Sequence, residues 1–165
     1  MLDNTIGKKA EKKVQQWLDR PEEGYCLDRQ KDQMTGFYGS KNICDFTLFK
    51  SPTMSYIESK STWEDNFPFA MIAGFNDPND ATSQYGGMLS KSKIVNVYGI
   101  VIALFATHQR AFILKVNDIA EYVASTGKKS LNIKKISSWA IPYIEIQTIP
   151  NNRKELLDYT GEWPL

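Results

Sequence analysis

Histidine and cysteine are scarce in this sequence. The 165 residues include one histidine, His108, and two cysteines, Cys26 and Cys44. A single imidazole excludes a multi-histidine metal centre and any nuclease that depends on two histidines. Two thiols form no structural zinc site without further ligands, and a disulfide between them stays an open alternative. The sequence predicts a polar turn around His108, and we assign this residue no role.

A surplus of charge and a long apolar run are also lacking. The 20 Lys and Arg residues against 19 Asp and Glu give a net charge of +1, so a polyanion would have to bind to local basic patches. The longest apolar run, over 98–106, is far shorter than a bilayer span. The N-terminus lacks the apolar run of a signal peptide. We therefore expect a soluble, cytoplasmic protein that has no membrane partner.

Apolar residues make up 42% of the chain, and its length suits one domain with a proper core. Periodicity predicts helices over 5–19, 82–95 and 118–125, with a short helical stretch over 154–159. Strands are predicted over 25–27, 43–49, 55–60, 98–106, 111–116 and 142–146. Asn117 is the expected N-cap of the third helix, and Gly127 is its expected stop. This order predicts a single mixed α/β domain over residues 1–165.

Three ionisable side chains lie on two adjacent predicted strands. Asp45 is in the middle of the first strand, and Glu58 and Lys60 are on the second. Because side chains alternate along a strand, Glu58 and Lys60 are expected to project to the same face. Carboxylate oxygens suit Mg²⁺, so a divalent cation would explain this polar patch. A cross-strand salt bridge on an exposed face explains the same residues, since such pairs are frequent and contribute only ~0–1 kcal/mol each.

The first predicted helix combines an apolar stripe with a lysine-rich face. The stripe consists of Ile6, Ala10, Val14, Trp17 and Leu18. Lys8 and Lys12 lie on the opposite face, which is either a DNA-binding surface or an ordinary solvated one. Glu11 lies at the edge of the stripe. It is either a functional residue or a boundary glutamate that pairs locally.

Basic residues gather in two further segments. The segment 28–42 interleaves basic and aromatic residues, a pattern that can hold phosphates and stack bases. Its candidates for contacts with DNA are Arg29, Lys31, Phe37, Tyr38 and Lys41. Lys128 and Lys129 belong to the densest basic cluster outside the first helix. A flexible loop and a solvated surface explain these residues equally well.

The two acids and the lysine resemble the motif of the PD-(D/E)xK nuclease superfamily. Asp45, Glu58 and Lys60 follow the spacing D-x12-E-x-K, although Cys44 replaces the proline of the motif. Upstream, the glycine at position 7 and Glu11 have a spacing similar to that of the helical glutamate of cellular and viral Holliday-junction resolvases.

Segments around this motif are similar to the RecU family of Holliday-junction resolvases. They include Tyr56 to Lys60 and the following Phe67-Pro68. The resemblance covers roughly residues 5–145, and the small size of the chain suggests a phage-encoded member. It implies a restriction-endonuclease-like α/β core, in which a mixed central sheet is flanked by helices.

The resemblance also implies roles for individual residues. The implied ligands of a Mg²⁺ ion, for which Mn²⁺ could substitute, are Asp45, Glu58, the carbonyl of Ser59, and Glu11 through a second metal or a water molecule. Lys60 would orient or deprotonate the attacking water, or stabilise charge in the transition state. Gln84 resembles a glutamine that follows the lysine in RecU-like proteins, and we predict that it contributes to catalysis.

The implied function is resolution of four-way DNA junctions by a homodimer, because two symmetric cuts require two active sites. The segment 28–42 is shorter than the stalk that RecU inserts into the junction, and the region 67–84 carries an insertion. One alternative is a different PD-(D/E)xK endonuclease that cuts duplex or flapped DNA. Another is a non-catalytic DNA-binding protein with the same fold.

Overall fold

A computed structural model of the chain describes residues 5–19, 21–29 and 44–147. The α-helices are α1 (Thr5–Leu18), α2 (Gln84–Lys91) and α3 (Val116–Thr126). The strands are β1 (Cys26–Arg29), β2 (Phe46–Lys50), β3 (Thr53–Thr62), β4 (Asn66–Pro68), β5 (Val97–Phe105), β6 (Arg110–Lys115), β7 (Ser130–Asn132) and β8 (Ile144–Gln147). Short 3₁₀ helices cover Pro21–Glu23, Phe69–Met71 and Ile133–Ser138.

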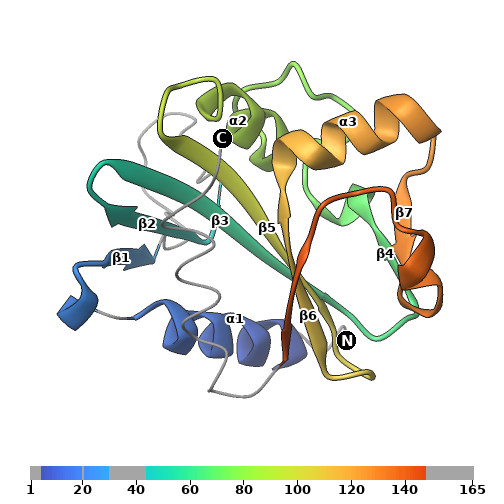
Figure 1. Cartoon of the computed structure of the whole chain (residues 1–165), viewed down its shortest axis with the longest axis horizontal. Coiled ribbons are helices and arrows are strands. Elements are labelled where there is room, and N and C mark those ends of the chain that lie inside the picture. Colours follow the sequence, from blue (N-terminus) through green and yellow to red (C-terminus); the bar gives the residue numbers. More distant parts are fainter. Residues whose placement is uncertain (1–4, 20, 30–43, 148–165) are drawn as a thin grey trace.

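Six strands form one mixed sheet in the order β1-β2-β3-β5-β6-β8. β3 and β5 are parallel, and all other neighbours in this sheet are antiparallel. A parallel pair requires a crossover connection, and here α2 lies on the crossover from β3 to β5. Figure 1 shows α1 below the sheet, with α2, α3 and the small β4-β7 ribbon on the opposite side. The predicted fold class, a mixed central sheet flanked by helices, is confirmed.

The central strand β5 is apolar on both faces, as its continuous run of apolar residues predicts. Ile100, Ile102 and Leu104 join the core beneath α1, where they meet Val14 and Leu18. The alternating residues Val101, Ala103 and Phe105 join the core on the opposite face. This alternation sandwiches the sheet between two apolar layers and fixes the register of its middle strands.

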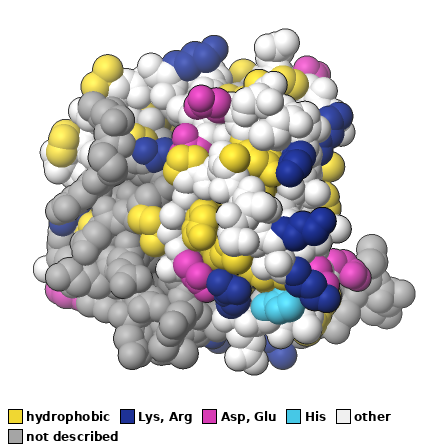
Figure 2. Space-filling model, turned by 45° about the vertical axis from the view of Figure 1, so that its right-hand side comes forward, with side chains coloured by type: hydrophobic (Ala, Val, Ile, Leu, Met, Phe, Trp, Pro, Cys, Tyr) yellow, Lys and Arg dark blue, Asp and Glu magenta, His cyan; other side chains and the backbone are white. Residues whose placement is uncertain are grey.

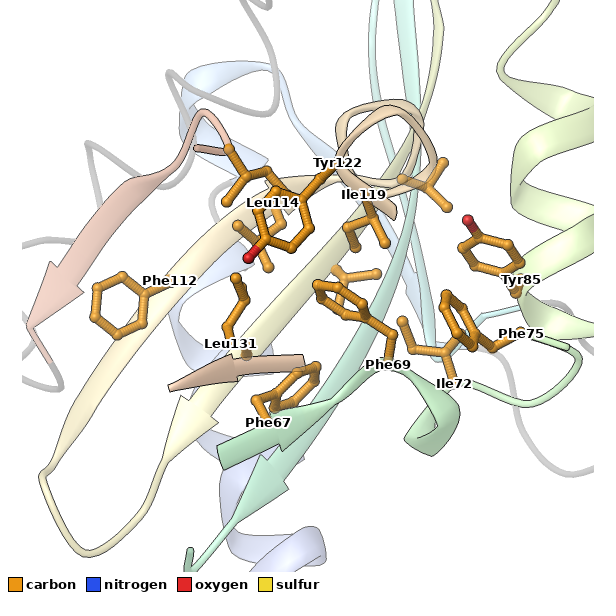
Figure 3. Packing of buried hydrophobic residues seen from close by; sticks show 14 of the residues in the cluster. Phe67, Phe69, Ile72, Phe75, Tyr85, Phe112, Leu114, Ile119, Tyr122 and Leu131 are labelled. Carbon is orange, nitrogen blue, oxygen red and sulfur yellow. The ribbon is translucent and has the colours of Figure 1, made fainter. Parts of the chain in front are cut away.

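The layer beneath α2 and α3 is rich in aromatic rings. Figure 3 shows rings from the segment after β3 lying beside side chains of α3 and the β7 strand. Phe69 packs edge-on against Tyr122, with ring centroids 6.1 Å apart, and Phe75 packs against Tyr85 at 5.1 Å. Edge-to-face pairs of this kind are favourable because of the charge distribution of the rings. The segment 67–84 thus contributes to the core of the sheet through Phe67, Phe69, Ile72 and Phe75.

Two helix boundaries differ from the predictions. α2 ends at Lys91, and Asn96 (φ 61°) lies in the left-handed region just before β5. α3 begins at Val116 with Lys115 in the N-cap position, so the predicted Asn117 cap is wrong. Asn117 instead accepts a hydrogen bond on Oδ1 from the Ser92 hydroxyl (3.0 Å). Gly127 ends α3 with φ 71°, a conformation that favours glycine, as predicted.

Most of the remaining strands lie close to their predicted ranges, whereas β4 and β7 were not predicted. β5 and β6 form the predicted hairpin, and β8 forms an edge of the sheet. The predicted helical stretch 154–159 lies outside the described residues. Within the described residues, no helix combines the length and apolar character needed to cross a membrane. Cys26 and Cys44 are both free thiols, so the structure contains no disulfide between them.

Candidate functional site

Asp45 lies where β2 separates from β3. Its backbone N–H donates to the carbonyl of Ile57 (3.0 Å), next to the last strand pair. Its side-chain Oδ2 accepts a hydrogen bond from the backbone N–H of Ser59 (2.9 Å). The carboxylate therefore continues the ladder beyond the end of the strand pairing. The prediction that Asp45 lies in the middle of a strand is therefore wrong, because β2 begins only at the next residue, Phe46.

Glu58 and Lys60 lie on one face of β3, as the alternation predicts. Lys60 Nζ is 3.1 Å from Glu58 Oε1, with 29% of the lysine side chain exposed and 1% of the glutamate. A salt bridge on an exposed face therefore does not describe this pair, because the carboxylate is buried. Burial of a carboxylate is costly unless charges or donors compensate it.

Burial and neighbouring acids raise the pKa of Glu58 to about 8. Loss of water contributes most, and the negative charge of Asp45 acts in the same direction. Lys60 lowers the pKa by its charge and its hydrogen bond, and Glu11 raises it again. The influence of Glu11 shows that the half-buried glutamate of α1 lies near enough to Glu58 to act on its charge.

One carboxylate oxygen of Glu58 has no partner. Oε1 contacts Lys60, whereas Oε2 is buried and receives no hydrogen bond. The buried Oγ of Ser59, on the next residue, is likewise without a hydrogen bond. Unsatisfied buried polar atoms are rare in native proteins and often mark an ion or a water site. A cation near Oε2 would both satisfy this oxygen and offset the like charges of Asp45 and Glu58.

The donor set around Glu58 fits a hard cation. Within residues 5–19, 21–29 and 44–147, no group of three or more His, Cys, Asp or Glu side chains is arranged to hold a metal ion. A Mg²⁺ ion takes only one or two carboxylates and otherwise keeps water, so Asp45 and Glu58 suffice if backbone oxygen contributes. Ser59 directs its N–H to Asp45. In a β-strand the carbonyl of the same residue points to the same edge, which is the edge that Asp45 occupies.

Cys44 also lies at this cluster, although nothing in the sequence marks it as a site residue beyond its place next to Asp45. Its buried Sγ donates to the carbonyl of Phe46 (3.1 Å). Burial, followed by the negative charges of Glu58 and Asp45, raises the pKa of the thiol to about 12. The thiol is therefore neutral and packs as a small apolar side chain.

Gln84, in contrast, takes part in a structural contact. It is the first residue of α2, and its Oε1 accepts a hydrogen bond from the backbone N–H of Ala73 (3.2 Å). This contact ties the start of α2 to the preceding segment. The predicted catalytic role of Gln84 gains no support from it.

The candidate DNA-binding residues are spread over several elements. Lys8 and Lys12 are exposed, one helical turn apart on α1, and Lys128 and Lys129 are exposed between α3 and β7. Arg29 ends β1, and its side chain lies outside the part of the chain that the structure describes. Lys31, Phe37, Tyr38 and Lys41 also lie outside the described residues.

A second charged cluster, which the sequence did not predict, forms just beyond the C-terminal end of β3. Asp65 Oδ1 is 2.8 Å from His108 Nε2, and its Oδ2 is 3.1 Å from Lys134 Nζ. These partners hold the pKa of Asp65 below its usual value, with the hydrogen bond to His108 as the largest cause. In Figure 2 the histidine side chain lies at the surface among basic and acidic side chains. The segments meet only through folding, so no motif in the sequence marks the cluster.

Comparison with known proteins gives one kind of match. No protein-family model matches the chain. No curated protein matches it. Among solved structures, the chain is similar to Hjc from Archaeoglobus fulgidus, a Holliday junction resolvase from an archaeal hyperthermophile, with a TM-score of 0.46 and 12% identity over 67% of this chain and 78% of that chain. The function proposed below therefore rests on the geometry of this chain's own residues.

Proposed function

We propose that this chain is a Mg²⁺-dependent endodeoxyribonuclease that hydrolyses phosphodiester bonds at four-way DNA junctions. The observation that carries the proposal is the buried Glu58, with one oxygen on Lys60 and the other without a partner, next to the carboxylate of Asp45. A salt bridge alone leaves Oε2 unsatisfied. A cation beside two acids and a lysine satisfies it and equips the site for hydrolysis.

The residues that would hold the metal are Asp45, Glu58 and the carbonyl of Ser59, with Glu11 from α1 acting through a water molecule or a second metal. The bound cation would offset the charge that develops on the phosphate and would help to activate water. Mn²⁺ would be a substitute, since the same oxygen ligands suit both ions. Support for the donor set comes from the orphaned oxygen of Glu58 and from the like charges that raise its pKa.

Lys60 supplies the other part of the proposed chemistry. Its ammonium group is partly exposed and lies 3.1 Å from Glu58, so it can donate to a phosphate oxygen or a water molecule brought to the site. A cation in this position stabilises negative charge in the transition state, and the same group orients the water that attacks. Asp45 is held in place by the N–H of Ser59, so it does not have to reorganise when substrate binds.

The junction preference and the homodimer belong to the proposal as well. Two matched cuts across a junction require two active sites related by a two-fold axis. Exposed lysines on α1 and after α3, notably Lys12 and Lys129, offer contacts to phosphates that do not depend on sequence. Cytoplasmic DNA of a bacterial cell or of an infected host is the expected substrate.

The test compares substrates and a variant that leaves the shape of the site intact. Wild type and Asp45→Asn are incubated with Mg²⁺ and with a labelled four-way junction, a flap and a linear duplex of matched sequence. We expect wild type to cut the junction fastest and Asp45→Asn to lose cleavage by at least ~100-fold, as for loss of one catalytic group. Exposed Asp77→Asn, on the insertion, is the control and should cut normally.

Each other outcome contradicts a definite part of the proposal. Equal cutting by Asp45→Asn would remove the assigned site. Equal rates on junction and duplex would leave an endonuclease without junction preference. Binding of DNA without cutting by wild type, in Mg²⁺ and in Mn²⁺, would make the chain a non-catalytic DNA-binding protein.

A further inference from the structure

Trp63 follows the end of β3, the strand that carries Glu58 and Lys60. Its side chain is 60% exposed, whereas Trp139 packs into the aromatic core. Trp63 lies three positions after Lys60, which corresponds to about 10 Å along an extended chain. An exposed indole is unfavourable in water and gains by stacking on another flat apolar surface.

The backbone around Trp63 is held on several sides. Its carbonyl accepts a hydrogen bond from the Thr107 hydroxyl (2.8 Å), on the turn between β5 and β6. The neighbouring carbonyls of Thr62 and Asp65 accept from the backbone N–H groups of Ala106 and Ile133, each at 2.8 Å. The main chain is therefore fixed while the indole faces solvent. A fixed backbone with an exposed ring lowers the entropy lost on binding, which is a property of a recognition residue.

Charged side chains of both signs lie near Trp63 in the sequence and the fold, and some of them are already paired with one another. The Asp65 carboxylate is already contacted by Lys134 and by His108. Lys135, next to Lys134, is exposed and can contact an anion. Exposed Glu64 offsets Lys135, so the exposed indole, rather than a surplus of positive charge, is the feature that suits a ligand with a flat ring.

We infer, on the basis of the function proposed above, that Trp63 stacks on a nucleobase at the branch point of the DNA bound at the Asp45–Glu58–Lys60 site. Its distance from Lys60 corresponds to roughly three nucleotides, at ~3.4 Å per nucleotide along one strand. Stacking of a base on an aromatic side chain needs an exposed base face. In a continuous duplex each face is covered by its neighbour, whereas a branch point exposes the faces of its terminal pairs. Trp63 therefore selects branched DNA over linear duplex.

The experiment measures binding without cleavage. The full chain in EDTA is titrated with a fluorescent four-way junction and with a linear duplex of the same sequence, and anisotropy gives both Kd values. We expect Trp63→Ala to weaken junction binding by about 5- to 100-fold, the range for loss of one stacked base, with Trp63→Phe between the two. Duplex binding should stay unchanged. Phe49→Ala, which removes another exposed ring (44%), should bind both DNAs as wild type does.

Two further measurements make the result specific. A 2-aminopurine at the branch point should be quenched by wild type and not by Trp63→Ala, because stacking on indole quenches its fluorescence. Glu64→Gln should strengthen binding of both DNAs, since it removes a negative charge near phosphates. Thermal unfolding of each variant shows whether it is folded. If Trp63→Ala is unfolded, the binding measurements on Trp63→Phe decide the test.

The failures of this inference and of the proposed function are distinguishable. If Trp63→Ala and Trp63→Phe bind the junction as tightly as wild type, or lose junction and duplex affinity equally, branch stacking is overturned while Mg²⁺-dependent cutting stands. If wild type stacks on the branch but cuts no DNA, the nuclease function is overturned and the stacking stands. If wild type binds neither DNA, in EDTA or in Ca²⁺, both are overturned.

Discussion

Two ion pairs on or just beyond the same strand have the same length and opposite surroundings. Lys60 Nζ is 3.1 Å from Glu58 Oε1, and Lys134 Nζ is 3.1 Å from Asp65 Oδ2. The Glu58 side chain is 1% exposed and that of Asp65 is 40% exposed. Both oxygens of Asp65 have partners, whereas Oε2 of Glu58 has none.

The difference is the one expected between a structural pair and the functional pair that we propose. The carboxylate pKa is lowered at Asp65, where partners stabilise the charge, and raised at Glu58, where burial and other acids destabilise it. A protein gains nothing in stability from burying a partly satisfied acid. Such a site persists when a ligand completes it, and perturbed acids cluster at functional sites for this reason.

The largest expected effect comes from truncating the lysine of the buried pair. Lys60→Ala removes the group that we propose to contact the phosphate, so we expect the cleavage rate at saturating DNA and Mg²⁺ to fall by ~10²- to 10⁴-fold. Single-turnover cleavage of the labelled junction measures it. Lys91→Ala, at the exposed end of α2, is the matched control and should cut normally. A Lys60→Ala protein that binds and cuts as wild type does would reduce Lys60 to a partner of Glu58.

The second prediction concerns stability of the metal-free protein. The pKa of Glu58 is about 8 in the folded chain, against 4.5 as its ordinary value. The stability associated with protonated Glu58 is therefore complete below pH ~4.5 and is lost as the pH rises through about 8. We expect Glu58→Gln, which keeps the neutral form, to raise the free energy of unfolding by ~1–3 kcal/mol at pH 9. Urea unfolding in EDTA at several pH values measures this gain.

The gain from Glu58→Gln should shrink toward zero near pH 4.5. Exposed Glu121→Gln on α3 is the control, and its effect on the free energy of unfolding should be small. A constant difference between Glu58→Gln and wild type over the whole range would mean that the carboxyl is not perturbed in the folded protein.

Periodicity predicted most of the fold. The alternation on either side of β5, the amphipathic helix α1 and the glycine stop of α3 are local patterns, and the structure has all three elements. The predicted Asn117 cap failed because the Ser92 hydroxyl, from a distant segment, binds its side chain. Tertiary contacts of that kind leave no local trace in the sequence.

The candidate site likewise has one part that local sequence predicts and another that depends on tertiary contacts. The spacing of Glu58 and Lys60 on one strand is local, and their contact follows from it. Burial of Glu58, by contrast, depends on how β2 separates from β3 and on the helix α1, so the sequence allowed an exposed salt bridge. The cluster of Asp65 with His108 joins three segments far apart in the chain, and no spacing could have predicted it.

The third prediction is that metal completes the buried pair. Mg²⁺ should stabilise wild type against urea by RT ln(1 + [Mg²⁺]/Kd), ~2.7 kcal/mol at one hundred times Kd. Since the cation must displace the proton of Glu58, the apparent affinity should increase as the pH rises from 6.5 to 8.5. Titration of the unfolding midpoint with Mg²⁺ at both pH values measures this. Stabilisation that persists in Asp45→Asn/Glu58→Gln would locate the cation elsewhere.

The smallest expected effect comes from Asp65→Asn, and its dependence on pH has the opposite sign to that of Glu58→Gln. The folded-state pKa of Asp65 lies below 3.8, so the stability it contributes is present above that pH and is lost as the pH falls through the folded-state value. Wild type should therefore exceed Asp65→Asn slightly in unfolding midpoint at pH 7, and the difference should vanish in strong acid. The difference should also diminish in 0.5 M NaCl. At this ionic strength the Debye length is roughly 3–10 Å, so salt screens the attraction between exposed charges. If Asp65→Asn instead gained stability relative to wild type as the pH rose, folding would disfavour the charged form of Asp65, as it does that of Glu58. The contrast between a satisfied surface pair and an incomplete buried pair would then fail.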